Sequence, residues 1–156
     1  MTNFICAPDA PGVPTMKCDK PFIVAYNKLF RYLSGYGKKK EVEHFWKLFS
    51  DTIMGRFKYL LETEGIVGLT KYWSETLTQE GANFNISMTS YLGKAVLLHL
   101  DICECPSLKK LKDEKQDIYP NYCDHCKALY GKTLKKAGYE WFQKFSDKGC
   151  SIWIKV

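Results

Sequence analysis

The first half of the chain has apolar residues at helical spacing. Asp19 suits an N-cap, and the pattern predicts a helix that starts there and ends at the SGYGKKK stretch, 34–40. Similar spacing predicts a second helix over 41–62. Gly65 then interrupts the pattern before a third helix over 66–79.

After residue 82 the period changes from helical to alternating, which indicates strands. Phe84, Ile86 and Met88 alternate with polar residues, and SYLGK at 90–94 predicts a turn. A second strand over 95–103 follows, and Pro106 ends it because proline has no amide to donate. One face of this strand carries aliphatic side chains, and the other carries Leu97, His99, Asp101 and Cys103, with Cys105 next in phase.

The last third predicts a polar connection over 107–120, a long helix over 121–145 and a final strand starting at Cys150. The fold class is therefore α+β: a small antiparallel sheet, made of the hairpin and the C-terminal strand, packed against about four helices. Residues 19–156 form a single domain in this interpretation. Residues 1–18, which contain three prolines, form an extended N-terminal arm.

Composition and charge narrow the partners. The net charge is +6, which favours a small anionic ligand, but only two of the 23 basic residues are arginine, Arg31 and Arg56. Because nucleic-acid readers depend on arginine forks, nucleic acid is disfavoured as a partner. No apolar run reaches the roughly 18 residues of a membrane span, so no membrane partner is expected. Aromatic residues make up 15% of the chain, which suits a pocket wall or a homodimer interface.

The chain contains seven cysteines, an odd number, and its N-terminus lacks the features of a secretory signal. This combination favours a reduced, cytoplasmic protein with metal-binding or reactive thiols over a disulfide scaffold.

Four of these cysteines form the pattern C-x-C-x17-C-x2-C, which could supply sulfur ligands to zinc or another thiolate-bound metal. The candidate metal ligands are Cys103, Cys105, Cys123 and Cys126, to which the final strand could add Cys150. The alternative is that several of these thiols are small buried hydrophobic side chains without a ligand.

A catalytic interpretation starts from His99, which shares a strand face with Asp101. In it, His99 is the base, Asp101 orients its ring, and Cys105 supplies a thiolate, a role that Cys123 could also fill. His125 lies between two cysteines and is expected to point away from them.

Three short motifs together resemble a known family: Cys105-Pro106, the YCDHC stretch at 122–126, and the Gly149-Cys150 pair that opens the last strand. They are similar to the bacterial L-2-amino-thiazoline-4-carboxylic acid hydrolase-like family and, more distantly, to the vinyl-reductase-like small-molecule-binding domain. The related domain spaces its closing glycine and cysteine apart, whereas here they are adjacent.

This resemblance implies a cytoplasmic α+β domain with a ligand pocket between helices and sheet, in which Cys105, Cys123, Cys126 and Cys150 match the pattern. It implies a hydrolase of cyclic amidine-type C–N bonds, acting on a small C–N/C–S ring such as a thiazoline carboxylate. The alternative function is a non-catalytic, cysteine-rich module that binds a metal or a small ligand.

Overall fold

The structure is a computed structural model that describes residues 20–156, apart from the side chains of 20, 21 and 51–53. The predicted N-terminal arm, 1–18, and the expected N-cap at Asp19 lie outside the described residues.

Three helices make up the first half of the described chain: α1 (Lys20–Gly37), α2 (Lys39–Ile53) and α3 (Gly55–Gln79). The predicted single helix over 41–62 is wrong, because the backbone leaves helical geometry at Met54 and divides this segment between α2 and α3. Gly65 has a positive φ of 60° and kinks α3 at the predicted break, but helix continues on both sides of it.

The sheet has four antiparallel strands in the order β1-β2-β4-β3: β1 (Asn83–Tyr91), β2 (Lys94–Glu104), β3 (Glu140–Phe145) and β4 (Cys150–Lys155). An α+β fold with a small antiparallel sheet is thus confirmed. Strand β3 was not expected, because the sequence pattern predicted helix through residue 145. Gly138, with a φ of 85°, ends the helix early, and the alternating, aromatic-rich segment after it pairs with β4 instead.

The region between the hairpin and β3 is more helical at its start and less regular later than the sequence suggested. Helix α4 (Pro106–Asp113) occupies part of the predicted connection, with Pro106 in its first turn and its apolar residues buried. The predicted long helix is a short α5 (Asp124–Cys126), a π-helical turn η1 (Lys127–Gly131) and α6 (Lys132–Lys136).

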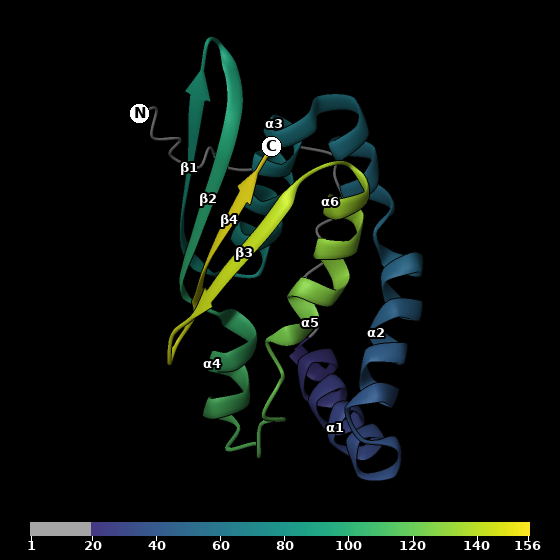
Figure 1. Cartoon of the computed structure of the whole chain (residues 1–156). Helices are drawn as coiled ribbons and strands as arrows, with labels where there is room; N and C mark the ends of the chain where they lie inside the picture. The colour runs from purple at the N-terminus through teal and green to yellow at the C-terminus, as the bar shows by residue number, and fades with distance from the viewer. Residues whose placement is uncertain (1–19) are drawn as a thin grey trace, which may run out of the picture.

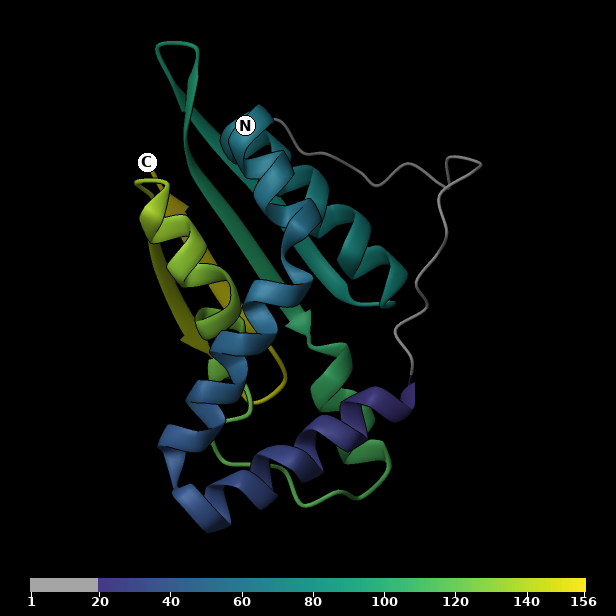
Figure 2. The ribbon, with the colours of Figure 1, turned by 90° about the vertical axis from the view of Figure 1, so that its right-hand side faces the viewer.

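The helices cover one side of the sheet (Figure 1), which we call the inner face. A first core cluster lies between this face and α3 and includes Leu98, Leu100, Ile152 and Ile154. A second core cluster lies beyond the end of the sheet, where α1 and α2 meet α4 around Phe30, Trp46 and Leu111. Figure 2 shows this second group of helices below the sheet, at the opposite end from the tip of the β1–β2 hairpin.

Strand alternation puts the remaining side chains of β2, β3 and β4 on the other side of the sheet, the outer face. Helix packs only on the inner face within the described part of the chain (Figure 1). On the outer face, the rings of His99 and Trp153 stack across β2 and β4 with their centroids 4.9 Å apart.

Candidate functional site

Four thiols gather where the two core clusters meet, and we call them the thiol cluster: Cys105, Cys123, Cys126 and Cys150. Cys105 follows β2 and immediately precedes α4. Cys123 and Cys126 flank and end the short α5, and Cys150 opens β4. Cys105 and Cys123 pack against the second core cluster, whereas Cys150 packs against the first.

Each thiol of the cluster lies close enough to the other three to interact with them electrostatically. Cys150, for example, interacts with Cys126 and Cys105 although these residues come from separate elements. The hairpin exit and the YCDHC segment therefore lie near one another in the fold.

Burial keeps these thiols protonated. Loss of solvation raises the pKa of Cys105 to about 11, and that of Cys123 to about 12, from an ordinary value of 9.0. The same effect raises the pKa of Cys126 and of Cys150 to about 12. Neighbouring thiols add to the pKa shifts of Cys105, Cys123 and Cys150, because two thiolates close together repel one another, whereas Glu80 adds to the shift of Cys126. At neutral pH the four thiols are thus uncharged and weakly nucleophilic.

Gly149 explains how Cys150 reaches the cluster. A Cβ atom at this position would lie 1.8 Å from the backbone oxygen of Ile102, so only glycine allows β4 to begin this close to β2. The backbone of Cys105 is tied to the same turn, because its N–H donates to the Lys148 carbonyl oxygen at 2.8 Å.

Two buried polar side chains hold the segment that carries Cys123 and Cys126. The Asn27 amide nitrogen donates to the Asp117 carbonyl at 2.9 Å, and its amide oxygen accepts from the Tyr119 N–H at 2.8 Å. Ser50 of α2 donates to the Leu129 carbonyl, which lies in the π-helical turn, at 3.0 Å. Helices α1 and α2 thereby fix the position of the YCDHC segment.

His125 was expected to point away from the cysteines, and this is wrong. Its ring packs among Phe30, Trp46 and Tyr122, and Nδ1 bonds to the Tyr122 carbonyl. Because a carbonyl only accepts, Nδ1 carries the proton and Nε2 is left as an acceptor, 3.6 Å from the Cys126 Sγ. Burial lowers the pKa of His125, so the ring is neutral near pH 7.

Glu80, which caps the C-terminal end of α3, is a second residue that sequence reasoning did not select. Burial raises its pKa, and its carboxyl group interacts electrostatically with Cys126, Cys105 and His125. Glu80 lies near the thiols only because of the way α3 packs against the sheet, and no local sequence pattern indicates this packing.

The other predicted site residues lie elsewhere. His99, Asp101 and Cys103 are on the outer face of the sheet, where Asp101 accepts from Ser151 at 2.7 Å. Cys103 is exposed, with its Sγ 3.9 Å from an Asp101 oxygen. The structure therefore puts His99, Asp101 and Cys103 on the opposite face of the sheet from the thiol cluster. Asp101 is nevertheless close enough to Cys150 to contribute to its raised pKa.

The metal-binding prediction requires the thiol side chains to change position. Within residues 20–156, no three His, Cys, Asp or Glu side chains already stand in an arrangement that could hold a metal ion. A metal at the thiol cluster would have to draw the sulfur atoms together by rotation of their side chains.

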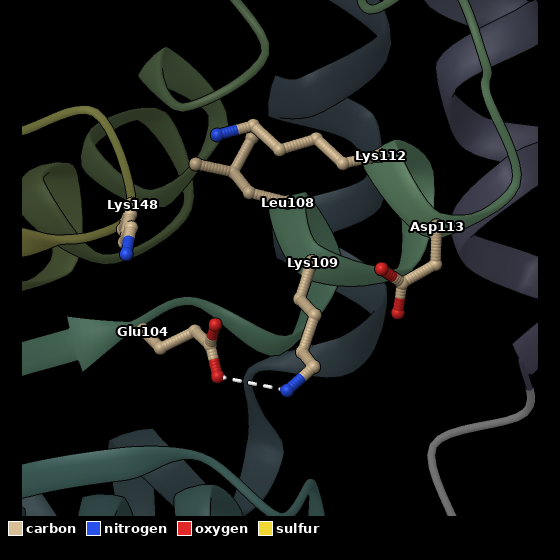
Figure 3. Close-up of a pocket in the computed structure, with 6 residues that line it drawn as sticks. All are labelled: Glu104, Leu108, Lys109, Lys112, Asp113 and Lys148. Atoms are coloured by element: carbon tan, nitrogen blue, oxygen red, sulfur yellow. Dashed lines mark hydrogen bonds and ion pairs between the residues drawn. The ribbon is translucent and has the colours of Figure 1, made fainter.

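A surface cavity of about 140 Å³ lies between the end of β2, helix α4 and the turn before β4 (Figure 3). It is lined by Glu104, Leu108, Lys109, Lys112, Asp113 and Lys148. The Lys109 ammonium pairs with Glu104 at 3.0 Å, and Lys112 donates to the Asp147 carbonyl at 2.7 Å. Three lysines against two carboxylates leave this cavity slightly basic.

Comparisons with known protein families, with curated proteins and with solved structures gave no match. In the described residues, every helix is too short or too polar to cross a bilayer.

Proposed function

We propose that the thiol cluster binds one thiophilic metal ion, with zinc as the first candidate, and that the protein is a cysteine-rich metal-binding module. The observation that carries the proposal is the mutual proximity of four thiols drawn from the β2 exit, the α5 segment and the start of β4. Four sulfur ligands are one of the usual sets of a closed, structural zinc site. The free thiols need reducing conditions, which supports a cytoplasmic location as part of this proposal.

The raised thiol pKa values make a specific prediction about metal binding. Because thiolate is the form that binds metal, each thiol that ligates must first lose its proton. Metal binding should therefore release close to four protons near pH 7, and the affinity should increase steeply with pH. A metal would also connect the two core clusters, since the thiols pack against both.

The test is titration of the reduced protein with cobalt(II), whose visible spectrum reports tetrahedral thiolate ligation, followed by displacement with zinc. We expect one ion per chain. Cys126→Ser should weaken zinc binding by more than about 100-fold, because losing a ligand costs more affinity than losing a residue that only hydrogen-bonds to a ligand. The matched control is Cys103→Ser, on the outer face, which should bind as the unmodified chain does. Equal binding by both variants would overturn the proposal.

The second candidate is the hydrolase that the sequence motifs imply, and the contact between His125 Nε2 and Cys126 Sγ favours it. This pair has the geometry of a base beside a nucleophile. The lysine-lined cavity near Cys105 offers a place for the carboxylate of a small anionic substrate. The His99–Asp101 pair, in contrast, is on the other face of the sheet.

Turnover of 2-amino-thiazoline-4-carboxylate tests this candidate. If Cys126 and His125 act together, Cys126→Ser and His125→Asn each abolish ring opening, while His99→Ala retains it. Loss of turnover in His99→Ala alone would return the chemistry to the outer face, and the absence of turnover by the unmodified chain would leave metal binding as the function.

A further inference from the structure

The outer face of the sheet carries a row of rings in register across three strands: His99, Trp153 and Phe142. Phe142 is 53% exposed although it is large and apolar. His99 and Trp153 are half-buried beside it, so Phe142 extends a partly exposed aromatic strip, and apolar surfaces of this kind commonly mark interaction sites.

Charges of both signs lie on either side of this row. On β3, Glu140 is two residues before Phe142 and Lys144 is two residues after it, so all three side chains share the outer face. On β4, Ser151 and Lys155 flank Trp153 in the same way, and on β2 Asp101 and Leu97 flank His99. The face is thus neither strongly basic nor strongly acidic, which argues against a polyanionic partner.

This distribution is self-complementary. If a second outer face is turned by a two-fold axis that lies along the row of rings, the two rows meet at the centre and the ends of β3 exchange places. Glu140 of one chain then faces Lys144 of the partner subunit, and Lys144 faces Glu140 of the partner subunit. Such an isologous contact closes after two chains.

We propose that the protein forms a homodimer through the outer face of its sheet, with the ring row at the centre and two reciprocal Glu140–Lys144 contacts at its edge. Two twisted sheets pack face to face about 10 Å apart in this way in β-sandwiches. The proposal does not depend on the thiol cluster, which is on the inner face.

The area of the outer face limits the expected affinity of the dimer. Four strands about 4.8 Å apart and about six residues long at about 3.3 Å each give a flat footprint of about 400 Å² per chain. Stable interfaces bury about 800 Å² of accessible surface per partner. Side-chain relief raises the accessible area above the footprint, so the dimer belongs at the lower end of the range and should dissociate at micromolar concentrations.

The test is sedimentation equilibrium of the full chain over a dilution series. Phe142→Glu should weaken dimerisation at least 10-fold. Tyr59→Glu is the matched control, because Tyr59 is a similarly exposed ring on α3 and its replacement should leave the dimer unchanged. Far-UV circular dichroism confirms that both variants remain folded.

A charge swap tests the geometry. Glu140→Lys and Lys144→Glu should each weaken the dimer, because each places like charges opposite one another, and the double variant should restore it. A chain that stays monomeric at several hundred micromolar, a dimer that Tyr59→Glu disrupts and Phe142→Glu does not, or a double variant no stronger than the singles would each overturn the proposal.

Discussion

The two faces of the sheet carry different chemistry, although alternate residues of the same strand, β2, contribute to both. On the inner face Leu98 and Leu100 are fully buried, and the thiol cluster lies at the end of the strand. On the outer face His99 and Asp101 meet a ring and a hydroxyl from β4. Residues two apart in the sequence therefore lie on the same face of the sheet only as far as the strand extends. Strand β2 ends at Glu104, and Cys105 turns into α4 on the inner side.

The largest predicted difference between the faces is their tolerance of alkaline pH. The folded pKa values of the cluster, about 11 for Cys105 and about 12 for Cys126, exceed the ordinary value of 9.0. Above pH 9 the unfolded chain therefore releases thiol protons that the folded chain retains, so stability is intact below pH 9 and is lost as the pH rises toward 11. Urea unfolding between pH 8 and 11 measures this loss.

Serine variants assign the alkaline loss to one face. Cys126→Ser should flatten the dependence of unfolding free energy on pH above 9, since one buried titrating thiol is removed. Cys103→Ser, which removes an exposed outer-face thiol, should leave the dependence unchanged. Identical slopes for the two variants would show that the cluster does not cause the effect.

Gly149→Ala should cost about 3–5 kcal/mol of unfolding free energy, because the new methyl group meets the Ile102 backbone oxygen and β4 cannot begin beside β2. Thermal unfolding measures it. Gly35→Ala is the control, since a Cβ there has open space and lies within α1, where alanine is favoured over glycine. A loss below about 1 kcal/mol for Gly149→Ala would show that the approach of β4 to β2 is not tight.

Adjacent residues of β2 compare the faces directly. Leu100→Ala should cost about 2–5 kcal/mol, because the side chain is fully buried in the first core cluster. His99→Ala loses its stacking on Trp153 and should cost at most about 1.5 kcal/mol. Chemical denaturation at pH 7.5 measures the unfolding free energy of both variants. A larger loss for His99→Ala than for Leu100→Ala would show that the inner face is not the core side of the sheet.

The smallest predicted effect is at the hairpin tip, which belongs to neither face. Leu92 and Gly93 have φ values of 49° and 74°, and Leu92 is 85% exposed. Leucine is poorly suited to a left-handed conformation that asparagine accepts, so Leu92→Asn should stabilise the fold by about 1 kcal/mol. A decrease in melting temperature would mean that the leucine side chain contributes more than its backbone strain costs.

Much of the fold was predictable because its signals are local. The alternation around Leu98, the turn at Gly93 and the break at Gly65 each follow from the spacing of a few residues. Strand β3 was missed because the lysine-rich segment before it favours helix, and its strand character depends on pairing with β4. Helix α4 was missed because only two buried leucines mark its apolar side.

The candidate site was predictable in part for the same reason. The cysteine spacing selected Cys105, Cys123 and Cys126 but also Cys103, which is exposed on the outer face, and Cys150 was added only from the expected final strand. The contact of His125 with Cys126 was hidden because α5 has only three residues, and the ring orientation depends on Phe30 and Trp46 from other helices. Helical spacing gives no information about a ring that distant residues position.

Residue-resolved thiol alkylation tests most directly whether the four thiols of the cluster bind one metal ion together. The reduced chain is treated with a maleimide, with and without one equivalent of zinc, and each cysteine is quantified by mass spectrometry. If the four thiols hold one metal ion, Cys105, Cys123, Cys126 and Cys150 become protected together while Cys103 remains reactive. Unchanged modification of the four residues, or protection of Cys103 in place of any of them, would contradict it.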